Sequence, residues 1–217
     1  MKQAFFIAGT DTEVGKTYVS CALMRHFTQQ NLRVAGMKPV ASGCEMLNGQ
    51  LINEDALHLQ ATANVSLPYA TVNPYAFAPA IAPHIAAQQA GVEIQFEPIL
   101  QAYAQIKQQT DVVIVEGAGG LLVPLNAQYN IADLVKELDI PIILVVGIKL
   151  GCINHAQLTA EAIRARGLKL VGWVANQITP GMLHISENIA TIQSSIQTPC
   201  FAEISWKAQA ITFKELL

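Results

Sequence analysis

The sequence predicts an α/β fold, with a doubly wound, mostly parallel sheet that carries helices on both faces. Short apolar runs rich in Val and Ile, nearly continuous rather than alternating, are typical of parallel strands buried on both sides. Segments of helical character separate these runs, which favours right-handed strand–helix–strand crossovers. The 217 residues suit one core of this class, and we expect a single domain over residues 1–217.

The elements follow in order along the chain. Strands are expected at residues 4–9, 33–40, 111–117, 141–147, 169–176 and 200–205. Helices are expected from 16 to about 30 and over 96–109, 131–138, 154–166 and 182–196. The stretch 68–83 contains several prolines and no periodicity, so we expect an ordered surface loop there, of a length that is often functional.

The composition excludes several classes of protein. Hydrophobic residues make up 52% of the chain and charged residues 13%, which argues against disorder. No apolar run approaches the roughly 20 residues of a membrane-spanning helix, and the N-terminus does not have the pattern of a signal peptide. We therefore expect a cytoplasmic protein with no membrane partner. A net charge of -3 without a basic cluster indicates no nucleic-acid partner.

The cysteines and the high apolar content bear on assembly. The four cysteines are widely scattered and form no C-x-x-C pair, so we expect reduced thiols and neither a zinc site nor a disulfide framework. A chain this apolar can bury part of its surface between subunits.

The stretch GTDTEVGKT, residues 9–17, is the main functional signal. It matches a phosphate-binding P-loop, except that five residues rather than four separate Gly9 from Gly15. A strand precedes it and a helix follows, so backbone N–H groups, Lys16 and the helix N-terminus would face phosphates, and the Thr17 hydroxyl would bind Mg²⁺. This context makes the expected fold P-loop NTPase-like. Glu13 would be repelled by phosphate, which indicates a cationic substrate amine nearby.

Further polar residues follow other strands, at the edge where such sheets bind ligands. Glu116 and the glycines after it suit a metal position, although a tight turn with a satisfied carboxylate is the alternative. Asp55 taken alone is a charge at a helix start. Lys38 is either aimed at phosphate or reaches past the sheet edge to solvent, and its spacing leaves both open.

Two later stretches complete this set. Residues 151–154 form a turn into a helix N-terminus, a natural seat for a carboxylate. Asn176 ends a strand, and its amide can pair with N6 and N7 of adenine. A turn-forming asparagine is the alternative.

Together these segments resemble the dethiobiotin synthetase family. The stretches that carry the resemblance run in the same order from Gly9 to Asn176: GTDTEVGKT, AGMKPVASG, DALHLQ, YATVNPYAF, APHIAA, VVIVEGAGGLLVPL, PIILVVGIKLGCINHAQLT and GWVAN. The resemblance implies carboxylation and ring closure of 7,8-diaminopelargonic acid with CO₂ or bicarbonate and ATP, dependent on Mg²⁺. A carbamate and a carbamic–phosphoric anhydride would precede dethiobiotin, ADP and phosphate. It also implies a homodimer with active sites at the subunit interface.

The resemblance further implies roles for individual residues. Lys16, Lys38 and Thr12 would be catalytic, and Thr17, Asp55 and Glu116 would bind Mg²⁺. Thr12, Glu13 and Ser42 would hold the carbamate and the amines, and Gly151 and Asn154 of the neighbouring subunit would hold the substrate carboxylate. The residues implied to bind ATP are Glu13, Val14, Gly15, Lys16, Thr17, Tyr18, Asp55, Glu116, Gly117, Ala118, Gly119, Asn176, Gln177, Ser205, Trp206 and Lys207. Ser205 departs from the family, which usually has Pro there before Trp206.

Three other classes of protein fit the sequence less well. Partitioning or nitrogenase-iron-type ATPases carry a second lysine and a glycine pair just before G-K-[ST], where this chain has Thr12 and Glu13. A cobyrinate amidase-type enzyme needs an attached glutaminase, for which 217 residues leave no room. A nucleotide-sensing module without turnover would be expected to lose charged groups such as Lys38 and Glu116.

Overall fold

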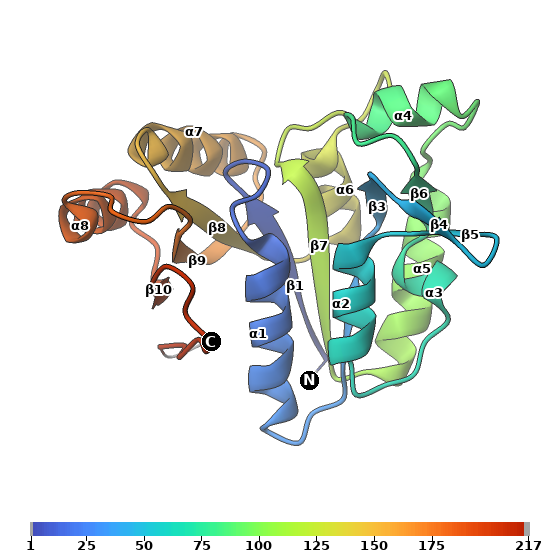
Figure 1. The fold of residues 1–217 in the computed structure, drawn as a ribbon, viewed down its shortest axis with the longest axis horizontal. Coiled ribbons are helices and arrows are strands. Elements are labelled where there is room, and N and C mark those ends of the chain that lie inside the picture. Colours follow the sequence, from blue (N-terminus) through green and yellow to red (C-terminus); the bar gives the residue numbers. More distant parts are fainter. Residues whose placement is uncertain (1, 215–217) are drawn as a thin grey trace.

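The computed structural model describes residues 2–214 (Figure 1). In this range one central sheet has the strand order β10-β9-β8-β1-β7-β2, with every neighbouring pair parallel. Its strands are β1 (Gln3–Gly9), β2 (Val34–Met37), β7 (Val112–Gly120), β8 (Ile142–Ile148), β9 (Leu170–Gln177) and β10 (Cys200–Ile204). The predicted α/β class with a doubly wound sheet is thus confirmed.

The helices and four short strands of the described range lie around this sheet. The helices are α1 (Lys16–Thr28), α2 (Glu54–Thr62), α3 (Tyr69–Val72), α4 (Pro83–Gln89), α5 (Phe96–Gln109), α6 (Ile131–Leu138), α7 (Cys152–Ala165) and α8 (Ile185–Ile196). Two small sheets pair β3 (Val40–Ser42) with β6 (Tyr75–Phe77) and β4 (Glu45–Leu47) with β5 (Gln50–Ile52). No helix in the described range is long and apolar enough to cross a membrane.

The alternation of side chains along β1 explains why both faces of the sheet are covered. Successive residues of a strand point to opposite faces, and Phe5 and Ile7 pack in one apolar cluster with the buried side of α1. Phe6 and Ala8 pack in the other cluster, with α5 to α8. Because all four side chains are buried, helices must cover both faces, as Figure 1 shows for α1 in front of the sheet and α5 and α6 behind it.

Three sequence predictions are wrong in detail. The strand expected at 33–40 ends at Met37, because Pro39 has no N–H for a sheet ladder and the Lys38 N–H donates to the Val72 carbonyl instead. The stretch 68–83 is not only a loop, since α3 and β6 form within it and β6 pairs with β3. Pairing with the sequence-distant strand β3 forms β6 despite the prolines, and the stretch itself has no periodic signal.

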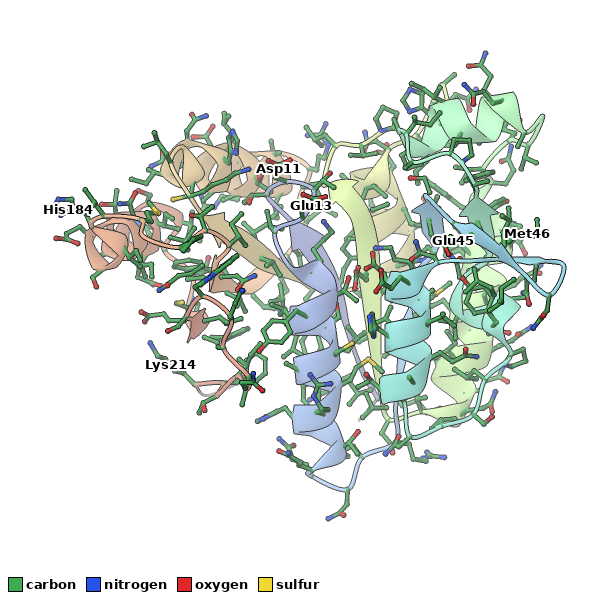
Figure 2. The ribbon with its side chains drawn as sticks, in the orientation of Figure 1. Asp11, Glu13, Glu45, Met46, His184 and Lys214 are labelled. Atoms are coloured by element: carbon green, nitrogen blue, oxygen red, sulfur yellow. The ribbon has the colours of Figure 1, made fainter. Side chains whose placement is uncertain are left out.

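The hairpin β4–β5 and the start of α8 were also not predicted. Figure 2 shows Glu45 and Met46 on this hairpin, well apart from the loop that carries Asp11 and Glu13. The last predicted helix starts at Ile185 rather than at residue 182.

Candidate active site

The P-loop-like stretch joins the carboxyl end of β1 to the first turn of α1, as its sequence predicts. Gly15 precedes the helix in the left-handed region with φ 87°, and Glu13 has φ 59°. Figure 2 shows Asp11 and Glu13 on this loop, at the N-terminal end of α1. The loop therefore places its backbone and the positive end of a 13-residue helix at one point of the sheet edge.

An ion pair fastens the loop to the neighbouring strand. Lys149, just beyond β8, places Nζ 2.8 Å from Oδ2 of Asp11, and the Thr12 N–H donates to Oδ1 of the same carboxylate. These two hydrogen bonds lower the pKa of Asp11. Lys149 belongs to no motif, and its only sequence signal is that it is a lone charge after a buried strand.

Lys38 lies at the centre of a buried charged cluster. Its Nζ is 2.6 Å from Oε1 of Glu116 and 2.9 Å from Oδ2 of Asp55. The Thr17 hydroxyl donates to the same Oε1 of Glu116 at 2.8 Å. Glu116 has no exposed surface and Lys38 is 4% exposed, so Lys38 does not reach past the sheet edge. This cluster joins side chains from β7, α1, α2 and the end of β2.

The two site lysines have opposite pKa shifts. Burial lowers the pKa of Lys38, but the charges of Glu116 and Asp55 outweigh it, so the net pKa is raised. Burial also raises the pKa of Asp55, and the charge of Lys38 reverses this to a net lowering. At Lys16, by contrast, burial and then repulsion from Lys38 lower the pKa to about 8. Lys38 therefore stays positively charged. The lowered pKa of Lys16 would rise again, and its positive charge would be favoured, when an anion such as phosphate binds beside it.

The oxygen atoms of this cluster fit the expected Mg²⁺. Oε2 of Glu116 is buried and has no hydrogen-bond partner within residues 2–214, which leaves one carboxylate oxygen available as a ligand. Thr17 and Asp55 add a hydroxyl and a second carboxylate. One or two carboxylates beside substrate phosphates are the usual magnesium environment.

A cavity of about 390 Å³ opens onto this cluster. It brings together the predicted catalytic, metal-binding and substrate-binding residues of the loop and of the strand ends. Its lining consists of Thr12, Glu13, Gly15, Lys16, Thr17, Lys38, Ala41, Ser42, Asn53, Asp55, Glu116, Ala118 and Gly119. Asn53 and Ala41 were not predicted. Asn53 accepts a hydrogen bond from the Ala56 N–H as the N-cap of α2, and that cap holds Asp55 at the helix start.

A second cavity of about 300 Å³ lies on the other side of Glu13, at the ends of β9 and β10. It gathers the residues expected near the adenine ring. Its lining consists of Glu13, Tyr18, Asn176, Gln177, Ile178, Ile204, Ser205, Trp206, Lys207 and Ala208. The Gln177 side chain accepts from the Trp206 N–H at 3.3 Å, and the Tyr18 hydroxyl donates to the Ala208 carbonyl. The cavity is therefore formed although Ser205 stands where the family usually has proline.

The remaining predicted residues lie elsewhere or at the margin. Val14 is fully buried beneath the loop, and Gly117 is buried within β7. Gly151 and Asn154 are exposed at the N-terminus of α7, and neither lines either cavity. One chain thus brings together the predicted phosphate, metal and base residues, but not the predicted carboxylate seat.

Comparisons with known proteins show which proteins the chain is similar to. A family model described as an AAA domain matches residues 3–212. The chain is 49% identical over 207 residues to the ATP-dependent dethiobiotin synthetase BioD of Xanthomonas oryzae pv. oryzae, with 95% of this chain and 92% of that protein covered. It is 48% identical over 208 residues to the protein of the same name from Aromatoleum aromaticum, with 96% and 92% covered.

Solved structures give the fold by a separate route. The cell division protein FtsY of Thermotoga maritima superposes with a TM-score of 0.57 at 14% identity over 99% of this chain and 66% of that one. The signal recognition particle receptor FtsY of Elizabethkingia anophelis, in complex with GDP, superposes with a TM-score of 0.54 at 16% identity. The superposition covers 99% of this chain but only 61% of the receptor chain. At such identities the likeness concerns the fold alone.

Proposed function

The chain belongs to the dethiobiotin synthetase family, and we propose that its two adjoining cavities carry out the reaction of that family in a single domain. The reaction is the ATP-dependent carboxylation and ring closure of 7,8-diaminopelargonic acid to dethiobiotin, a step of biotin biosynthesis, and the chain is thus a ligase. The observation that carries the residue assignments is that Lys16, Lys38, Asp55 and Glu116 line one cavity with Thr12 and Ser42.

The proposed chemistry begins when one amine of the substrate attacks CO₂ and loses a proton, giving a carbamate. A carbamate oxygen then attacks the γ-phosphate and ADP departs, leaving a carbamic–phosphoric anhydride. The second amine attacks the carbonyl carbon, loses a proton and expels phosphate, which closes the ring. In each step negative charge develops on oxygen atoms. Fixed cations and N–H donors are therefore the groups that would lower the barriers.

Lys38 and Lys16 are proposed to meet that charge from two sides. Lys38 is held by two carboxylates at the floor of the cavity, so it keeps its charge without a ligand. Lys16 rests on the Asp11 carbonyl at 3.0 Å, a weak partner that phosphate oxygens can replace. The two lysines therefore suit the carbamate and the phosphates respectively.

Glu13, Thr12 and Ser42 are proposed to hold the substrate. Glu13 and Thr12 are exposed in the cavity lining, where their carboxylate and hydroxyl are free to accept from amines. Glu13 also lines the second cavity and so lies between the proposed base and diamine positions. This placement agrees with the extra loop residue serving the substrate rather than ATP.

Thr17, Asp55 and Glu116 are proposed to hold Mg²⁺. When bound, the ion would add positive charge at the phosphate oxygens. Oε2 of Glu116, which has no hydrogen-bond partner among the residues that the structure describes, supports this assignment more directly than the motif does. The free cysteines and the proposed use of ATP both suit the expected cytoplasmic location.

A homodimer with shared active sites is the last part of the proposal. Leu150 is 95% exposed in the segment expected to serve the neighbouring subunit. Leu122 and Leu158 are exposed around an apolar groove of about 410 Å³. Thr10, at the start of the phosphate loop, lines the same groove. A partner seated there would cover these side chains and bring its own Asn154 toward a site that lacks a carboxylate seat.

The experiment for this proposal is an ATP turnover assay in which the diamine, bicarbonate and Mg²⁺ are omitted one at a time. Turnover that needs all three is expected. Turnover that ignores the diamine would contradict the proposal and favour a simple ATPase.

A further inference from the structure

Asn176 makes a contact that reading an adenine ring does not require. Its Nδ2 donates to the carbonyl of Val14 at 2.8 Å, although the two residues are 162 positions apart in the chain. A carbonyl can only accept, so the amide nitrogen must face the loop. Asn176 is 8% exposed at the end of β9, where it pairs in register with Gly147 and Ile204. It is therefore held firmly on the sheet and reaches toward the phosphate loop.

We propose that Asn176 is a positioning residue that fixes the peptide group between Val14 and Gly15 in the orientation needed to bind phosphate. This inference rests on the proposed ATP site and adds a role for Asn176 that is independent of the base.

The peptide geometry gives the reason. In a trans peptide the C=O and N–H point in opposite directions, so a Val14 carbonyl tied to Asn176 turns the Gly15 N–H to the opposite side. Gly15 lines the cavity of Lys16 and Glu116. Rotation of this one peptide would replace an N–H donor by a carbonyl oxygen, which repels phosphate.

The loop needs such a restraint because Gly15 is conformationally free. Gly15 has φ 87°, a region that glycine enters at little cost, and it can also leave that region at little cost. Close packing supports the restraint, since a Cβ placed on Gly15 would meet Nδ2 of Asn176 at 2.2 Å. The side chain of Val14 is buried against the backbone of Gly147, so the next strand holds the loop from that side.

Asn176 has two possible roles, contacting the adenine base and orienting the phosphate loop. A ligand without a nucleobase separates them. Inorganic tripolyphosphate with Mg²⁺ contacts only the phosphate site, so its affinity reports on the loop alone. The variants are Asn176→Ala, which removes the donor, and Asn176→Asp, which keeps the shape but turns an oxygen toward the Val14 carbonyl. Gln177→Ala is the matched control, because Gln177 lines the same nucleobase cavity and its side chain, among residues 2–214, bonds only the Trp206 N–H.

Calorimetric titration should show tripolyphosphate affinity falling about tenfold in Asn176→Ala, from the lost hydrogen bond and the freed peptide, and further in Asn176→Asp. Gln177→Ala should weaken ATP but leave tripolyphosphate unchanged. Unchanged tripolyphosphate binding in both Asn176 variants would overturn the inference, and so would failure of both to fold, because a loop restraint does not hold the core together. Lack of ATP binding by the unaltered chain would instead refute the proposed function itself.

Discussion

The ammonium of Lys38 lies 2.6 Å from Oε1 of Glu116, and both side chains are almost wholly removed from solvent. A buried pair of this kind contributes little to stability over an apolar pair, yet breaking it is costly. Its presence therefore indicates a functional requirement for a fixed cation. Asp55, the second carboxylate partner of Nζ, is half-exposed, and both Asp55 and Lys38 line the cavity.

Replacing Lys38 by Met should reduce kcat by a hundredfold or more, on the order of one lost transition-state donor. ATP affinity should change by less than about threefold, since Lys16 and the loop remain. Single-turnover kinetics beside nucleotide titration measure the two effects. Equal losses in both would mean that Lys38 only binds nucleotide.

The control for this variant is its stability, because Lys38→Met leaves Glu116 buried and unpaired. Urea unfolding should show a loss of about 3–5 kcal/mol. The double variant Lys38→Met/Glu116→Gln should recover much of that loss without recovering activity. Recovered activity in the double variant would show that the single variant fails through folding.

Glu13→Gln should weaken diamine binding by about tenfold or more while ATP binding holds or improves slightly, because removing a negative charge near phosphate relieves repulsion. Glu13 lies between the two cavities, so both ligands are measured on the same variant by titration. Glu13→Gly is the backbone control, since glycine tolerates the positive φ of this position. Loss of ATP rather than diamine affinity would assign Glu13 to the nucleotide.

ATP binding without added Mg²⁺ should depend on the charge of Lys16. Folding lowers the pKa of Lys16 to about 8, so the free protein loses this charge as pH rises through 8. Phosphate favours the charged form and raises the pKa, so binding should take up protons above pH 8 and affinity should fall from there upward. Well below pH 8, where Lys16 is already charged in the free protein, this group should have no effect. Calorimetry in buffers of different ionisation enthalpy measures the uptake.

Lys16→Arg is the matched control, because arginine stays charged throughout this range. Its affinity for ATP should be nearly flat between pH 8 and 9.5. If the affinity of both proteins fell over this pH range, the pH dependence would have to come from a group other than Lys16.

Two inactive variants should complement each other if active sites are shared between subunits. Lys38→Ala removes a residue of one subunit's cavity, and Asn154→Leu removes a residue expected to serve the neighbour's. A refolded mixture should regain about a quarter of the activity, since half of randomly paired dimers are mixed and each has one intact site. No recovery in a mixture shown to contain mixed dimers would place each site within one chain.

The sequence predicts the central sheet well because buried parallel strands are short, apolar and flanked by glycine. It fails at Lys38, where one proline divides a predicted strand into β2 and β3. It also fails at β6, because pairing with β3 depends on a partner more than 30 residues away, which no local pattern records.

The site was predictable in its residues but not in its geometry. Motif spacing places Lys16 and Thr17, whereas Lys38 and Asp55 acquire roles in the sequence only through the family resemblance. Their contact through Nζ at 2.9 Å, and the tie between Asn176 and Val14, depend on how distant elements meet at the sheet edge. Neither contact has a sequence signal of its own.

The most direct test of the central claim follows ¹³C-labelled bicarbonate in a single turnover with ATP, Mg²⁺ and 7,8-diaminopelargonic acid. The account predicts that the label appears in the ring carbonyl carbon of dethiobiotin, with one ADP and one phosphate formed for each ring closed. ADP released at the same rate without the diamine, or a product without the label, would contradict it.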